Sequence, residues 1–162
     1  MKNRSGWTRM AVAGGAGALA GGLATVVMSG AMFAAKRAGL MGDMPPEKIT
    51  AHALDKLGVD RDPAVQDALA SALHIGFGAA AGALFGVVED RLEPPGPGVL
   101  KGLAYGTVIW GLSYAGWVPA VGIMARPDHD RPGRPQSMLA AHWVFGIVLV
   151  AILGRLRVHQ RP

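Results

Sequence analysis

The chain has 162 residues, of which 51% are apolar and 17% charged, with a formal net charge of +5 and no cysteine. Soluble domains carry about 25% charged residues, so this composition indicates a membrane protein. The absence of cysteine excludes disulfides, thiolate metal sites and cysteine nucleophiles. The basic residues flank apolar segments in twos and threes, which favours lipid headgroups over nucleic acid as their partner.

Four uncharged windows, 20 to 26 residues long, divide the chain. A helix of about 20 apolar residues crosses the roughly 30 Å core of a bilayer. We therefore expect an all-α fold: a polytopic membrane protein with four transmembrane helices in an antiparallel bundle, which forms one domain over residues 1–162. The predicted spans are about residues 10–33, 68–89, 98–118 and 137–154.

The first span is rich in glycine, with six glycines between residues 10 and 33. Glycine disfavours a helix in water, but in lipid the backbone has to satisfy its own hydrogen bonds, so a helix is expected. The apolar run also exceeds the about 7–15 residues of a secretory signal, and we expect that it is not cleaved.

The loop between the first two spans contains the signals of an additional short helix. Pro46 suits the first position of a helix and Gly58 suits its end. An amphipathic helix over Pro46–Leu57 is therefore expected, on the membrane surface or as a cap on the bundle. Asp62 and Pro63 favour the N-cap and the first residue of the helix that contains the second span.

Glycines recur every fourth residue in three of the spans and therefore lie on one face of each helix. Small residues let helix backbones approach closely in lipid, where no hydrophobic effect drives helices together. We expect these faces to pack helices within the chain, and they also suit a homo-oligomer or a subunit of a membrane complex. The helix-packing candidates are Gly17, Gly21, Gly78, Gly82, Gly86, Gly98, Gly102 and Gly106.

Four spans would place both termini on one side of the membrane. The terminal side and the opposite side each carry eight Lys and Arg residues, so the positive-inside rule gives no orientation. The opposite side also carries eight of the 11 acidic residues, which favours cytoplasmic termini.

Two histidines lie inside spans that begin on the same side. His74 is about six residues into the second span and His142 about five into the fourth, so at about 1.5 Å per residue they reach a similar depth. Ionisable residues within a membrane are candidates for function. The two histidines are therefore the candidate cofactor-binding residues of this chain.

Several roles remain open for His74 and His142. Neutral imidazoles can hydrogen-bond a neighbouring helix, which needs no cofactor, or they can relay protons. Two imidazoles on facing helices can ligate a haem. Thioethers with imidazoles suit Cu(I), which adds Met28 and Met32 to the metal candidates. We predict no cofactor and keep haem and copper as alternatives.

The polar loop before the fourth span contains Asp128-His129-Asp130. Such a cluster can bind a divalent metal or take part in catalysis, but in a proline-rich loop it is more typical of a solvated turn. The sequence has no phosphate-binding loop, dinucleotide fingerprint, nucleophile elbow or metalloprotease motif. An enzyme is therefore not favoured, although membrane enzymes often lack such short motifs.

Three segments together resemble a known group of proteins. They are the pair Pro45-Pro46, the run Gly102–Tyr114 and the run Met138–Gly146. They are similar to parts of the YagU-like small bacterial inner-membrane proteins, a group of unknown function. The resemblance implies a multi-span protein of the bacterial inner (plasma) membrane.

These features favour a non-enzymatic membrane protein, either structural or an accessory subunit of a membrane complex. The alternative is a small channel or transporter in which His74 and His142 line a polar pocket. A second alternative is a haem- or metal-binding membrane protein. Both alternatives require the two histidines to face one cavity. The arrangement of the histidines therefore distinguishes these alternatives from a structural or accessory role.

Overall fold

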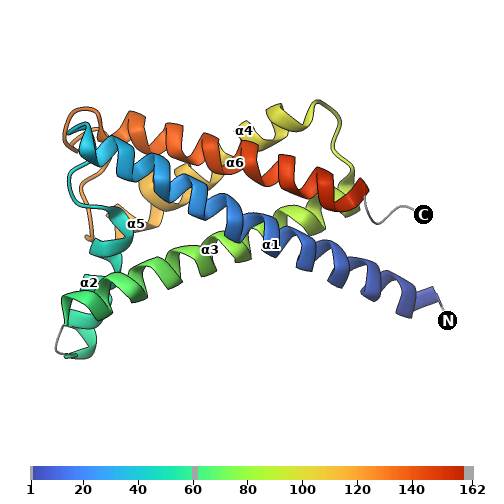
Figure 1. Cartoon of the computed structure of the whole chain (residues 1–162), viewed down its shortest axis with the longest axis horizontal. Helices are drawn as coiled ribbons and strands as arrows, with labels where there is room; N and C mark the ends of the chain where they lie inside the picture. Colours follow the sequence, from blue (N-terminus) through green and yellow to red (C-terminus); the bar gives the residue numbers. More distant parts are fainter. Residues whose placement is uncertain (1, 60–61, 159–162) are drawn as a thin grey trace.

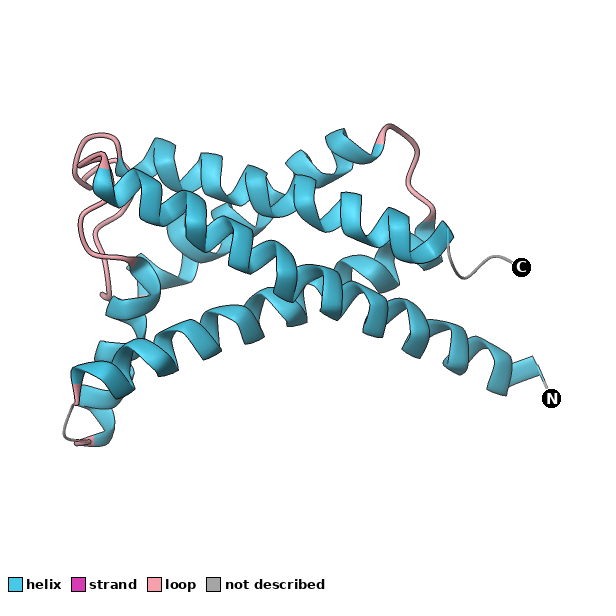
Figure 2. Cartoon of the chain, viewed as in Figure 1, coloured by secondary structure: helices cyan, strands magenta, loops and turns pink. Residues whose placement is uncertain are grey.

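The computed structural model describes residues 2–59 and 62–158, and within these ranges the regular secondary structure is helical throughout (Figure 2). The all-α prediction is therefore confirmed. The elements in chain order are α1 (Lys2–Arg37), α2 (Pro45–Leu57), α3 (Pro63–Leu92), α4 (Gly98–Leu112), the π-helical segment η1 (Ser113–Trp117), α5 (Val118–Ala120) and α6 (Arg134–Val158).

Three helices are long and apolar enough to cross a membrane, as expected for an integral membrane protein. They contain the segments Gly6–Arg37 in α1, Pro63–Leu92 in α3 and Arg134–Leu156 in α6. The first, second and fourth predicted spans lie within these segments. Each helix is longer than its predicted span because the helical backbone continues through the polar residues at the ends of the apolar run.

The third predicted span, residues 98–118, is helical throughout but is not one regular α-helix, and the count of four spans stays a prediction. α4 has 15 residues and is followed by five residues of π-helix and a three-residue α5. The N–H of Val118 bonds to the carbonyl of Ser113, five residues earlier instead of four. Pro119 lacks an N–H and its ring disfavours a regular helix in the preceding turn, which gives a physical reason for the wider turn.

The helices pack mainly in pairs (Figure 1). α1 crosses α3 and also lies against α6, α4 packs against α6, and α2 packs against α3. The start of α1, the end of α6 and the α3–α4 turn lie at one end of the molecule. The segments 38–44 and 121–133 lie at the other end, which we call the loop end.

α1 and α3 meet through glycine backbone. A Cβ atom added to Gly21 would lie 2.8 Å from the Cα of Gly82, and one added to Gly82 would lie 2.6 Å from the Cα of Gly21. No side chain fits at such distances, so the two backbones are in direct contact. Gly17, Gly78 and Gly86 lie in the same contact, where an added Cβ would also collide with the facing helix.

α4 and α6 meet in a similar way. A Cβ on Gly102 would lie 2.5 Å from the carbonyl oxygen of Gly146, and one on Gly106 would collide with the carbonyl of His142. Gly146 was not among the packing candidates because no other glycine lies four residues from it. Gly98 was a candidate, but nothing lies within 4 Å of a Cβ added there. Gly98 begins α4, ahead of the contact with α6, so a packing role for it stays a prediction.

α2 begins at Pro45, one residue before the predicted start, and ends at Leu57. Gly58 follows with a φ of 65°, in the left-handed region that favours glycine at the end of a helix. Asp62 caps α3 by accepting a hydrogen bond from the N–H of Ala64 at 2.8 Å. Local sequence signals therefore set the end of α2 and the start of α3. α2 packs against α3 and covers one side of the loop end.

Candidate functional site

A cavity of about 270 Å³ lies at the loop end. Its wall is built from α1, α2, α3, η1, α5 and α6, so it forms where segments from most of the chain converge. The lining is mostly apolar and aromatic, with a few polar side chains. This combination is typical of sites that bind small molecules.

The cavity brings the two candidate histidines together. His74 lies on α3 and His142 on α6, and both line the cavity. α3 and α6 each pack against α1, so the two rings reach the same space from different helices. Ser113 and Tyr114 of η1 line the cavity too, and the π-helical turn therefore contributes its polar side chains to the same space.

Each imidazole is held through its Nδ1 atom. His142 is 5% exposed, and its Nδ1 lies 2.7 Å from the carbonyl oxygen of Met138. A carbonyl oxygen accepts hydrogen bonds, so Nδ1 of the neutral ring donates and Nε2 is unprotonated. In His74, Nδ1 lies 3.3 Å from Oγ of Ser29 on α1. These contacts leave Nε2 of both rings for another partner.

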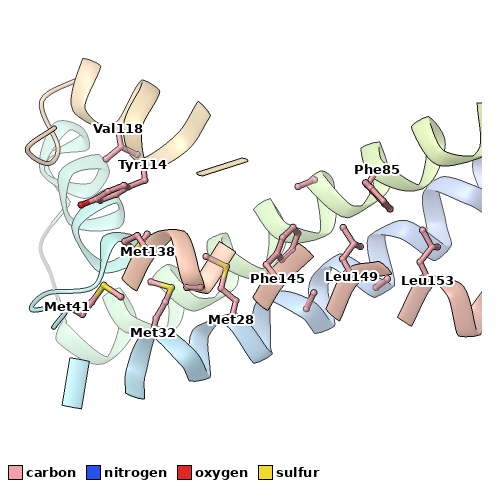
Figure 3. Close-up of a cluster of buried hydrophobic side chains, with 14 of the residues drawn as sticks. Met28, Met32, Met41, Phe85, Tyr114, Val118, Met138, Phe145, Leu149 and Leu153 are labelled. Carbon is pink, nitrogen blue, oxygen red and sulfur yellow. The ribbon is translucent and has the colours of Figure 1, made fainter. Parts of the chain in front are cut away.

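Three thioethers line the cavity as well. Met28 and Met32 come from α1 and Met138 from α6, and their exposed fractions are 4%, 1% and 3%. Figure 3 shows them gathered with Met41 and Tyr114 at one end of the buried cluster. The four metal candidates of the sequence, two methionines and two histidines, thus surround one cavity.

A buried polar network joins the loop end to the cavity wall. The hydroxyl of Tyr114 donates to Oδ2 of Asp130 at 2.5 Å, and Nη1 of Arg134 donates to Oδ1 of the same carboxylate at 2.8 Å. Nε of Arg134 donates to the carbonyl oxygen of Met41 at 2.6 Å. The side chains of Asp130 and Arg134 are 4% and 11% exposed. The network therefore connects η1, the start of α6 and the two loop segments.

Sequence reasoning missed this network. Asp130 and Arg134 lie in a loop rich in proline and charge, and such a loop is more typical of solvated residues. Their opposite charges and close spacing were a signal of an ion pair, although Asp130 lies in the loop before α6. The partner Tyr114 lies 16 residues away in sequence, and no local pattern links it to the pair.

The triplet Asp128-His129-Asp130 is divided between two environments. Asp130 is buried in the network, whereas Asp128 and His129 are exposed. Nδ1 of His129 lies 3.1 Å from Oδ2 of Asp128. The hydrogen bond from His129 lowers the pKa of Asp128 below its usual value. Within residues 2–59 and 62–158, no group of three or more His, Cys, Asp or Glu side chains is arranged to hold a metal ion.

Comparison with known proteins gives a family but no function. The sequence matches the model of a family of unknown function, DUF6789, over residues 11–162. No curated protein matches the chain. No solved structure matches it either. The YagU-like resemblance and a bacterial origin stay predictions.

Proposed function

The chain belongs to DUF6789, a family of unknown function, and we propose from its cavity that it is a non-enzymatic membrane protein that binds or carries a small ligand. The observation that supports this proposal is the position of His74 and His142, which line one cavity from two different helices. The cavity of about 270 Å³ beside both rings leaves space for a small ligand, which helix packing alone does not require.

The proposal places the chain in a bacterial inner membrane with four spans and cytoplasmic termini. α4 starts at the end where α1 starts, whereas α6 starts at the loop end. The chain therefore has to return between them, and the consecutive helical pieces α4, η1 and α5 provide this path. We infer that these pieces together form the third of the four spans, with a π-helical turn inside it.

The packing favours a binding site over a continuous pore. Away from the loop end, α1 and α3 are in direct backbone contact at Gly21 and Gly82, and the aromatic and aliphatic side chains of Phe85, Phe145 and Leu149 fill the interior (Figure 3). The cavity therefore belongs to one half of the molecule. Its volume of about 270 Å³ is at the lower limit of pockets that enclose drug-sized molecules, about 300–1,000 Å³, which favours a ligand smaller than haem.

Cysteine substitution tests this role and does not require the ligand to be identified. The chain has no cysteine, so a single introduced thiol is the only one present. Ala70 and Ala81 are a matched pair, because both lie buried on α3 but of the two only Ala70 lines the cavity. We expect a small methanethiosulfonate reagent to modify Ala70→Cys at least about tenfold faster than Ala81→Cys, since thiol reactivity requires solvent access.

Equal, slow modification of both variants would contradict a ligand site. It would show that the cavity is sealed, and the role as a structural protein or accessory subunit of a membrane complex would then be favoured. Assembly into a homo-oligomer or a larger membrane complex stays a prediction in either case.

A further inference from the structure

We infer that the cavity is a Cu(I) site whose ligands are Met28, Met32, His74 and His142. This inference rests on the proposed ligand-binding function and names its ligand. Four potential donors of two kinds, thioether sulfur and imidazole nitrogen, line a single cavity. Thioether ligands select soft metal ions such as Cu(I), and imidazole also suits copper.

The donors come from three helices with favourable spacing. Met28 and Met32 are one turn apart on α1 and therefore lie on one face of that helix. His74 reaches the cavity from α3 and His142 from α6, and both helices pack against α1. Met138, one turn before His142, adds a third thioether to the same wall.

The hydrogen bonds of the two rings would orient them as metal ligands. A histidine that binds a metal through one nitrogen almost always hydrogen-bonds a carbonyl, carboxylate or water through the other, which fixes its orientation. His142 makes such a bond to the carbonyl of Met138, at 2.7 Å. His74 is held through the same ring atom by the hydroxyl of Ser29, at 3.3 Å. The bond to a carbonyl leaves Nε2 of His142 as the ligand atom, and Nε2 of His74 is the ligand atom in the tautomer in which Nδ1 donates to Ser29.

The charge of the cavity favours a monovalent ion. Its described lining contains no Asp, Glu, Lys or Arg, and the nearby carboxylate of Asp130 is paired with Arg134 and Tyr114. Hard divalent cations such as Mg²⁺ and Ca²⁺ need oxygen ligands, chiefly carboxylates. A neutral set of sulfur and nitrogen donors in apolar surroundings instead matches Cu(I), which carries a single charge and prefers soft ligands.

Competition for copper tests the assignment. The full-length protein in detergent would be titrated under ascorbate against the coloured Cu(I) complex of bicinchoninate. We expect one equivalent of Cu(I) per chain to move to the protein. His142→Gln, His74→Gln and the double variant Met28→Leu/Met32→Leu should each weaken the affinity by about 100-fold, and Ser29→Ala, which removes only a support of His74, by about 10-fold.

Met41→Leu is the matched control, because Met41 is a fully buried methionine of the same cluster that does not line the cavity. It should bind Cu(I) as the unchanged chain does. The inference is overturned if the folded protein takes no copper from the chelator, or if the histidine and methionine variants bind as tightly as Met41→Leu. If copper does not bind but Ala70→Cys still reacts faster than Ala81→Cys, the copper assignment fails and the ligand-binding function stands.

Discussion

Asp130 lies at the centre of the buried network at the loop end. Its carboxylate accepts hydrogen bonds from Tyr114, Arg134 and the backbone N–H of Arg131, and its side chain is 4% exposed. A buried charge is costly unless it is paired and hydrogen-bonded. Removal of the carboxylate would leave the guanidinium of Arg134 buried without its counter-charge.

We therefore expect Asp130→Ala to destabilise the protein by about 3–5 kcal/mol, the usual effect of breaking a buried ion pair from one side. Tyr114→Phe removes one hydrogen bond and leaves the ion pair, so it should cost about 1–2 kcal/mol. Thermal unfolding of the detergent-solubilised protein, followed by circular dichroism, measures both changes.

Asp128→Ala is the control for this prediction. Asp128 lies two residues before Asp130, but its side chain is 60% exposed and pairs with Arg126 and His129 at the surface. Exposed pairs contribute little, so the substitution should leave the melting temperature close to that of the unchanged chain. Equal effects of Asp128→Ala and Asp130→Ala would show that the network does not stabilise the loop end.

At the level of helices, the contact between α1 and α3 depends on the absence of side chains. A Cβ at position 82 would lie 2.6 Å from the Cα of Gly21, and backbone atoms on both sides leave no flexible group that can move aside. Gly82→Ala is therefore expected to push the two helices apart and to cost about 1–3 kcal/mol, as overpacking does elsewhere.

Gly76→Ala provides the comparison on the same helix. Gly76 is exposed on α3, and nothing lies within 4 Å of a Cβ added there. Alanine favours a helix over glycine, so this variant should be neutral or more stable by up to about 1 kcal/mol. The melting temperature of Gly82→Ala should lie below that of the unchanged chain, and that of Gly76→Ala at or above it. A Gly82→Ala protein as stable as Gly76→Ala would contradict the glycine contact.

The helices themselves were largely predictable from the sequence. Long apolar windows indicated α1, α3 and α6, and local cap signals at Gly58 and Asp62 indicated the limits of α2 and α3. The break at Ser113–Trp117 was not predicted because the apolar window continues through it. Apolar composition reports on the surroundings of a segment, whereas the number of residues in each turn depends on local hydrogen bonds and on Pro119.

At the scale of the molecule, the candidate site was predictable in part. The sequence indicated His74, His142, Met28 and Met32 because polar or polarisable side chains within apolar spans are conspicuous. It did not indicate the contribution of α2 to the cavity wall or the buried Asp130 network, because both depend on how distant loops meet at the loop end. Residue type identifies candidates, and tertiary contacts decide which of them share a space.

The number of spans determines whether all parts of the loop end lie on the same side of the membrane. If α4, η1 and α5 together cross the membrane, the segment 121–133 lies on the same side as α2. If they do not cross, this segment lies on the side of the α3–α4 turn. Single cysteines at Leu57, Leu92 and Asp128 distinguish the two arrangements, because all three positions are exposed and the chain has no other thiol.

We expect a membrane-impermeant maleimide to label Leu57→Cys and Asp128→Cys in intact cells and to label Leu92→Cys after the membrane is opened. This pattern follows from four spans with cytoplasmic termini. Labelling of Leu57→Cys and Asp128→Cys only after opening, with Leu92→Cys labelled in intact cells, would keep four spans and reverse the orientation. Labelling of Asp128→Cys together with Leu92→Cys would contradict a span formed by α4, η1 and α5. The loop end would then be divided between the two sides of the membrane, and the cavity between α2 and α6 would not form in a bilayer.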